Sequence, residues 1–179
     1  MIQDVEVQEG DRFHPGGIAT DMESVWVPVA EYRPNSTSSI QKRNKRTLDI
    51  EASFSVPDYV GCVATTAEYV IGGNWDSRDF YIWDHAGQLV RKVANITENA
   101  YQDMKFEGGV LVASGLLRDG IGAIDWIEFP SFRLVRRLRV GNTERQIPFT
   151  REGMAIRGKE LLLLPEDDPS RVFIFAVVR

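Results

Sequence analysis

A fourfold repeat of strand-like segments is the feature of this sequence that most constrains its fold. At four places a short polar turn leads into a small apolar strand, and the matching positions Ile18, Cys62, Met104 and Met154 are 44, 42 and 50 residues apart. This spacing is typical of β-propellers, in which each repeat is one antiparallel sheet of four strands. β-Branched and aromatic runs fill the chain, and no long segment keeps the apolar period of a helix. The sequence therefore predicts an all-β propeller.

The repeat predicts four blades of four antiparallel strands each, within one domain that covers residues 1–179. We expect the blades at about residues 17–54, 61–94, 104–140 and 153–178, and the last of these is one strand short. Residues 3–8 alternate apolar and acidic side chains, which predicts a strand that completes the last blade and covers its edge. The alternative is an incomplete larger ring, whose open edges would favour a homo-oligomer.

Composition narrows the kinds of partner. The net charge of −5 lacks the concentrated basic surface that binding to nucleic acid requires. The longest apolar runs have the length of strands, so we expect no membrane-spanning segment. Residues 1–13 lack the apolar region of a signal peptide, which makes the cytoplasm the default compartment. The only cysteine, Cys62, lies in an apolar strand, so neither an intrachain disulfide nor a cysteine metal cluster is expected.

Propeller geometry sorts the polar residues onto two faces. The turn that leads into each innermost strand lies on the same face as the turn between the second and third strands. That face collects histidine, carboxylates, arginine and asparagine, and functional residues commonly sit on loops held by a rigid scaffold. Three side chains at equivalent blade entrances could bind a divalent cation or act as acid and base: His14, Asp103 and Glu152. The alternative is that they bond to the backbone of neighbouring blades and hold the ring together.

Other polar side chains on this face are candidates for the rim of a ligand site: Glu31, Arg33, Asn74, Arg78, Gln102 and Arg151. The leading hypothesis is that the protein binds a small molecule or other ligand at the channel mouth. One alternative is a metal-assisted hydrolase similar to lactone-hydrolysing propellers, an idea that depends on analogy between folds. Another is a scaffold that holds a protein partner through its rim loops.

Two further patterns have structural interpretations. Three consecutive acids in Pro165–Pro169 indicate a solvated acidic turn. The four tryptophans are interpreted as packing between blades: Trp26, Trp75, Trp83 and Trp126.

Several segments together resemble an uncharacterised bacterial and plant propeller family, a domain of unknown function. The segments that carry the resemblance are Gly10-Asp11-Arg12-Phe13-His14-Pro15-Gly16-Gly17-Ile18, Val25-Trp26-Val27-Pro28-Val29-Ala30-Glu31-Tyr32-Arg33-Pro34, Trp75-Asp76-Ser77-Arg78-Asp79-Phe80-Tyr81, Tyr101-Gln102-Asp103 and Pro165-Glu166-Asp167-Asp168. The resemblance covers the chain from about Gly10 to its end and implies no activity. It implies one more blade upstream of the His-Pro-Gly-Gly turn, and a secretion signal could precede that blade.

Overall fold

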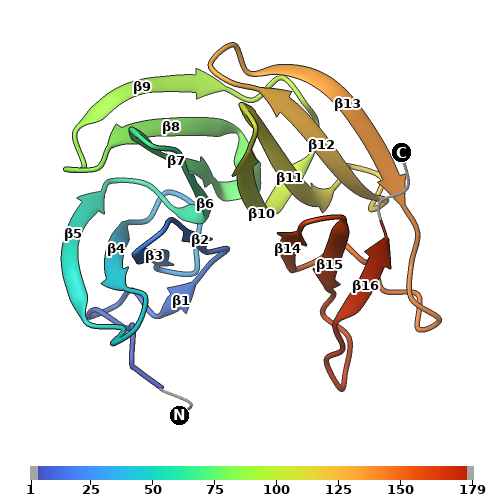
Figure 1. Ribbon diagram of the computed structural model, residues 1–179, viewed down its shortest axis with the longest axis horizontal. Coiled ribbons are helices and arrows are strands. Elements are labelled where there is room, and N and C mark those ends of the chain that lie inside the picture. Colours follow the sequence, from blue (N-terminus) through green and yellow to red (C-terminus); the bar gives the residue numbers. More distant parts are fainter. Residues whose placement is uncertain (1–3, 177–179) are drawn as a thin grey trace. The chain divides into compact units, whose positions relative to one another are not determined.

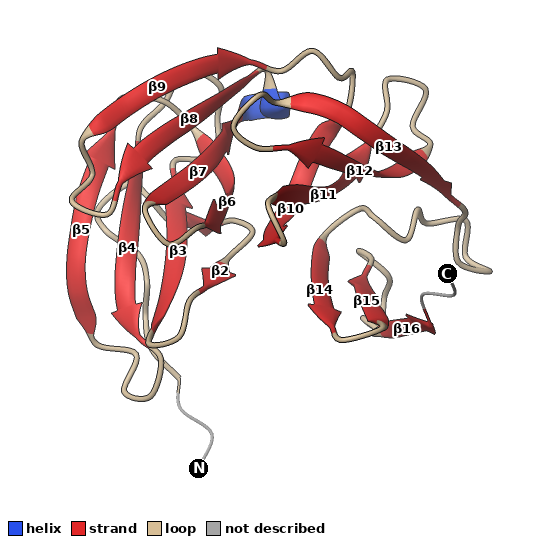
Figure 2. Cartoon of the chain, turned by 45° about the horizontal axis from the view of Figure 1, so that its top comes forward, coloured by secondary structure: helices blue, strands red, loops and turns tan. Residues whose placement is uncertain are grey.

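The computed structural model describes residues 4–176, and its regular secondary structure consists of β-strands and one short 3-10 turn (Figures 1 and 2). The chain forms two compact units, Met1–Asn95 and Ile96–Arg179, and each unit contains two antiparallel sheets. We call them unit 1, with sheets 1 and 2, and unit 2, with sheets 3 and 4. The expectation of a single domain stays a prediction.

Unit 1 contains the first two repeats. In sheet 1, two short strands pair with the same neighbour, and the order is β1 (His14–Pro15) and β2 (Ala19–Thr20), β3 (Ser24–Ala30), β4 (Ser38–Asn44) and β5 (Ile50–Val56). In sheet 2, the order is β6 (Val60–Thr65), β7 (Tyr69–Asn74), β8 (Asp79–Asp84) and β9 (Leu89–Ala94), with the 3-10 turn η1 (Trp75–Ser77) between β7 and β8.

The innermost strand of sheet 1 is interrupted where it meets sheet 2. A strand was expected from residue 17, but Gly16 and Gly17 lie between β1 and β2 and turn toward the neighbouring sheet. The Gly17 amide donates to the Gly61 carbonyl at 2.9 Å, and the Val63 amide donates to the Gly17 carbonyl at 2.9 Å. A Cβ atom at Gly16 would lie 2.0 Å from the Gly61 oxygen, so only glycine allows this approach. The two glycines of the His-Pro-Gly-Gly turn therefore join sheet 1 to sheet 2.

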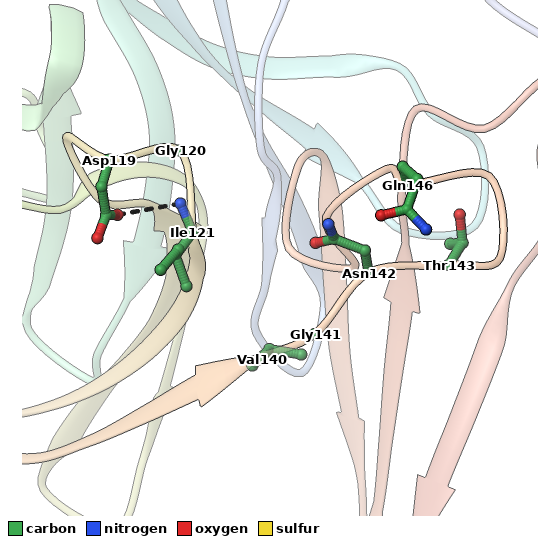
Figure 3. Close-up of a pocket in the computed structure, with 8 residues that line it drawn as sticks. All are labelled: Asp119, Gly120, Ile121, Val140, Gly141, Asn142, Thr143 and Gln146. Atoms are coloured by element: carbon green, nitrogen blue, oxygen red, sulfur yellow. Dashed lines mark hydrogen bonds between the residues drawn. The ribbon is translucent and has the colours of Figure 1, made fainter.

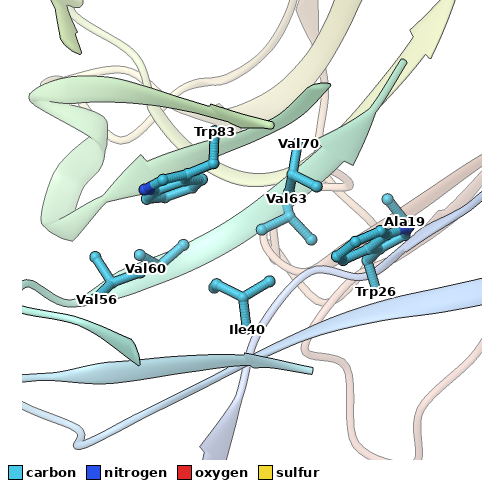
Figure 4. Close-up of a cluster of buried hydrophobic side chains, with 8 residues drawn as sticks. All are labelled: Ala19, Trp26, Ile40, Val56, Val60, Val63, Val70 and Trp83. Atoms are coloured by element: carbon cyan, nitrogen blue, oxygen red, sulfur yellow. The ribbon is translucent and has the colours of Figure 1, made fainter. Parts of the chain in front are cut away.

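An apolar cluster fills the space between the two sheets of unit 1 (Figure 4). Its buried members come from both sheets: Ala19, Trp26, Ile40, Val56, Val60, Val63, Val70 and Trp83. Burying each large side chain contributes roughly 1.5–3 kcal/mol, so this cluster is a substantial source of stability in unit 1. Trp26 and Trp83 thus have the packing role that the sequence predicted.

Unit 2 contains the third and fourth repeats. Sheet 3 has the order β10 (Ala100–Glu107), β11 (Val110–Leu116), β12 (Gly122–Glu128) and β13 (Arg133–Val140). Sheet 4 has three strands within the described residues, β14 (Gly153–Arg157), β15 (Glu160–Leu164) and β16 (Phe173–Ala176). A smaller apolar cluster of Val112, Ile124, Met154 and Leu163 packs these sheets together, with Trp126 against it.

The structure corrects three predicted boundaries. The sequence predicts that the last strand of the first blade begins at Thr47, but β5 begins at Ile50, because the Asn44 side chain accepts the amides of Arg46 and Thr47 and so holds a turn there. Residues 101–103, expected as a turn, belong to β10, where a bulge leaves Gln102 without a partner in the strand register.

The predicted strand over residues 3–8 is the third correction. Residues 4–8 form no strand, and Gln3 lies outside the described residues. Instead, the carbonyls of Glu6 and Val7 accept hydrogen bonds from the β4 side chains of Arg43 and Gln41. The buried polar groups of β4 thus bind this segment within unit 1.

Candidate functional site

Four aromatic rings from four separate segments of unit 1 meet. His14 begins β1, Tyr32 follows β3, Tyr59 precedes β6, and Trp75 follows β7. The ring centroids of His14 and Tyr32 are 4.3 Å apart, those of Tyr32 and Trp75 5.8 Å, those of Trp75 and Tyr59 4.8 Å, and those of Tyr59 and His14 6.4 Å. Each ring therefore contacts two others in a closed circuit. We call these four residues the aromatic cluster.

The aromatic cluster combines a buried base with an exposed outer ring. Tyr59 is buried, His14 and Trp75 are half-buried, and 61% of Tyr32 is exposed. Within residues 4–176, no hydrogen bond to protein uses the ring nitrogens of His14, the hydroxyl of Tyr32 or the indole nitrogen of Trp75. Desolvation lowers the pKa of His14, so its ring is neutral at pH 7 and carries one donor and one acceptor. The cluster thus presents apolar ring surface together with unused polar groups.

A hydrogen-bond network beneath the cluster fixes the turns that carry Tyr59 and Trp75. Asp58 Oδ2 accepts the Asn74 side-chain amide at 3.0 Å and the Tyr81 hydroxyl at 2.8 Å. Asn74 Oδ1 in turn accepts the Asp79 amide at 2.8 Å. Both ends of the Asn74 carboxamide are therefore bonded within the protein. Asn74, a predicted ligand residue, has the contacts of a positioning residue.

The charged side chains beside the cluster are paired with each other. Glu31 accepts Arg33 Nε at 3.0 Å and the Thr37 hydroxyl at 2.7 Å, and these hydrogen bonds lower the pKa of Glu31. Arg78 lies 3.5 Å from Asp76 in an exposed pair. Because each cation has a nearby anion, the rim around the aromatic cluster carries little net charge.

Asp103, on β10 of unit 2, is almost completely buried. Its Oδ1 accepts the Met104 amide at 2.8 Å and the Lys105 ammonium at 2.5 Å, and its Oδ2 accepts the Met154 amide of β14 at 2.8 Å. Asp103 therefore bonds to the backbone of the neighbouring sheet, which is the structural alternative that the sequence left open. The bulge residue Gln102, next to it, is exposed.

Arg151 and Glu152 lie at the start of β14, also in unit 2. Arg151 Nε is 2.6 Å from Glu166 Oε2. Glu152 keeps contact with solvent, yet partial desolvation raises its pKa, and the like charge of Glu166 adds to the shift. Among residues 4–176, no three histidine, cysteine or acidic side chains are placed to hold a metal ion. The divalent cation suggested by the sequence stays a prediction.

Three of the four cluster residues were absent from the predicted ligand set: Tyr32, Tyr59 and Trp75. A signal for them exists in the sequence. In each of the first two repeats, one aromatic residue lies in the turn before the innermost strand and another in the turn between the second and third strands. This regularity is the sequence signal for the aromatic cluster. Packing between blades was predicted for Trp75, and its ring does contact Tyr32 of the first blade as well as Tyr59 of its own blade, although this contact lies in the turn η1 and outside the apolar cluster.

Four successive antiparallel sheets define the class of the protein: it is a four-bladed β-propeller. The chain belongs to the family described as "family of unknown function (DUF6454)", which matches residues 1–107. This confirms the resemblance to a family of unknown function. No curated protein sequence matches the chain. Within the described residues, no helix is long and apolar enough to cross a membrane.

Solved structures of other proteins have a similar fold, and two of them illustrate the likeness. The glutaminyl cyclase of Myxococcus xanthus is similar with a TM-score of 0.63 and 14% identity, over 87% of this chain and 66% of that one. This chain thus spans slightly less than two thirds of that enzyme. The computationally designed Ika4 protein is similar with a TM-score of 0.53 and 14% identity, over 99% of this chain and all of that one. At this identity the likeness concerns the fold alone.

Proposed function

We propose that this protein binds an uncharged, ring-shaped small molecule on the aromatic cluster of unit 1. The observation that carries the proposal is the combination of exposed Tyr32 with three polar ring groups that make no protein hydrogen bond, on His14, Tyr32 and Trp75, in the described chain. Ligand sites typically combine aromatic surface with a few placed polar groups. A flat ligand stacks on the rings and bonds at its edge to the neutral imidazole, the hydroxyl and the indole.

The charge around the cluster supports an uncharged ligand. The arginines at the rim are paired with Glu31 and Asp76, so neither offers an unneutralised cation to an anionic ligand. The ring contacts also hold the side chains of His14, Tyr59 and Trp75 in place, so ligand binding loses little side-chain entropy. A hydroxylated sugar ring and an uncharged nucleoside both have a flat face and a polar edge.

Ligand-observed NMR with methyl β-D-glucopyranoside and with uridine tests the proposal. We expect saturation transfer from the protein to at least one of these ligands. In Tyr32→Ala we expect the affinity for that ligand to fall about tenfold or more, because the substitution removes buried ring area and an aromatic contact that contributes about 1 kcal/mol beyond that area. Met22→Ala is the matched control, since Met22 is 95% exposed on the turn at the opposite end of β3. Binding of neither ligand at millimolar concentration, or equal losses in the two variants, would refute the proposal.

A further inference from the structure

Unit 2 contains an open pocket that lies entirely between two of its own loops (Figure 3). The first loop joins β11 to β12 and contains Asp119–Ile121, and the second follows β13. The pocket has a volume of about 570 Å³, which is within the usual range for small ligands. Its lining residues are Asp119, Gly120, Ile121, Val140, Gly141, Asn142, Thr143 and Gln146.

Both loops are held by hydrogen bonds of their own. In the first, the Gly120 amide donates to the Leu117 carbonyl at 2.8 Å, and Asp119 Oδ1 accepts the Ile121 amide at 3.1 Å. In the second, the Thr143 amide donates to the Ile147 carbonyl at 2.8 Å, and Thr143 itself is buried. The walls of the pocket are therefore formed before any ligand arrives.

Arg145 anchors the second loop to the rest of unit 2. Its Nη1 is 2.8 Å from Asp167, which is buried and also pairs with Arg171. Asp167 is the middle acid of the run that the sequence suggested to be a solvated turn. That interpretation was wrong for Asp167, because two arginines from outside the run neutralise it and allow its burial, whereas Glu166 and Asp168 are exposed.

The groups that face the pocket are of three chemical kinds. Asp119 is the only lining residue with a charge, and just one of its oxygens is used by its own loop. The carboxamides of Asn142 and Gln146 make no hydrogen bond to residues 4–176. Ile121 and Val140 supply apolar surface. Figure 3 shows the Asn142 carboxamide pointing away from its own loop toward the side of the pocket where Ile121 lies.

We propose that this pocket binds the amino-terminal end of a short peptide. The ammonium group pairs with Asp119, because this carboxylate has no cation from the pocket lining beside it. A carboxamide both donates and accepts, so Asn142 and Gln146 match the N–H and C=O of a peptide group. A small apolar side chain packs on Ile121 and Val140. The carboxylate of Asp119 disfavours the carboxyl-terminal end of the same peptide.

The test measures binding of the tripeptide amide Ala-Leu-Ala-NH₂ to the whole protein by isothermal titration calorimetry. We expect binding to the wild type and a loss of at least about tenfold when the peptide is N-acetylated, because the charge-assisted hydrogen bond disappears. Asp119→Asn should weaken binding similarly while keeping the Oδ1 acceptor for Ile121. Glu107→Gln, which removes an exposed charge elsewhere in unit 2, is the matched control and should bind as the wild type does.

A filling variant locates the site. Gly141 lines the pocket, and a Cβ atom there would meet no atom within 4 Å, so Gly141→Leu adds volume at the pocket wall without a clash at its Cβ, and we expect it to weaken binding strongly. The proposal is overturned if the peptide does not bind at millimolar concentration, if the acetylated peptide binds equally well, or if Gly141→Leu binds normally. Ring ligands bound at the aromatic cluster should be unaffected by these variants, so this proposal and the preceding one fail independently.

Discussion

The two units join their sheets by different means. In unit 1, main chain bonds directly to main chain, because Gly17 of the first sheet exchanges hydrogen bonds with Gly61 and Val63 of the second, and the Ser38 hydroxyl of β4 adds bonds to the backbone of Asp58 and Val60. In unit 2, a side chain makes the junction, since the Asp103 carboxylate on β10 accepts the Met154 amide on β14. A bulge lies at each point, at Gly61 in β6 and at Gln102 in β10.

The comparison shows how one repeat position can be stabilised in two ways. Bulges redirect local groups out of the strand register. Where glycines allow two backbones to approach, the bulge presents a carbonyl to the neighbouring sheet. Among the described residues of unit 2 no glycines allow such an approach, and the residue after the bulge, Asp103, reaches the neighbouring sheet with its carboxylate. Unit 1 should therefore be sensitive to added volume at its junction, and unit 2 to the loss of an acceptor.

Gly16→Val should give the largest effect. Its Cβ would lie 2.0 Å from the Gly61 oxygen, and relief requires the sheets of unit 1 to separate. We expect a loss of about 3 kcal/mol or more in the free energy of unfolding, measured by urea titration. Gly141→Ala, whose Cβ meets nothing within 4 Å, is the control and should change stability by under about 1 kcal/mol. Equal effects of the two substitutions would contradict the close backbone approach.

Asp103→Ala should be nearly as damaging in unit 2. The substitution leaves the buried amides of Met104 and Met154 without their acceptor, and each unpaired group costs about 1–3 kcal/mol. We expect a total loss of about 2–4 kcal/mol in the same measurement. Glu107→Ala, at the exposed end of the same strand, should change stability by less than about 0.5 kcal/mol. An Asp103→Ala protein as stable as the wild type would show that the carboxylate does not hold the junction.

Acid should weaken unit 1 through a group that unit 2 lacks, because both histidines lie in unit 1. Desolvation lowers the pKa of His14 below 6.5 in the folded state. Between that lowered value and 6.5 the unfolded chain binds more protons, so this contribution to stability rises with pH and is complete above about 6.5. Titration of the histidine ring signals by NMR, assigned with His85→Gln, should give His14 a pKa below 6.5. A value at or above 6.5 would contradict the desolvation.

Exposed ion pairs should matter least in both units. The Arg33–Glu31 pair in unit 1 and the Arg157–Glu160 pair in unit 2 both have largely exposed arginines. We expect Arg33→Gln and Arg157→Gln each to change the free energy of unfolding by no more than about 1 kcal/mol. Circular dichroism melts at low and high salt would check this, and a large loss for either variant would mean that its pair orders a turn.

The sequence was sufficient for the propeller class and for most strand boundaries, because turn residues and apolar runs are local signals that recur with the repeat. The acidic run at Pro165–Pro169 shows where local signals fail. Asp167 is buried by Arg145 and Arg171, and only the folded loops bring Arg145 to it. The aromatic cluster is an intermediate case, since its turns could be predicted but not the contacts between rings from four separate segments.

The single cysteine, Cys62, allows the opening of unit 1 to be measured by thiol labelling. The sulfur is fully buried on β6, at the position that faces Gly17 across the junction between the two sheets. A thiol reagent can therefore reach it only when the packing around β6 opens, and the rate of labelling measures how often this happens in the native protein. Because the chain has no second cysteine, the reaction is silent about unit 2. The labelling rate of the protein therefore reports the opening of unit 1 without any contribution from unit 2.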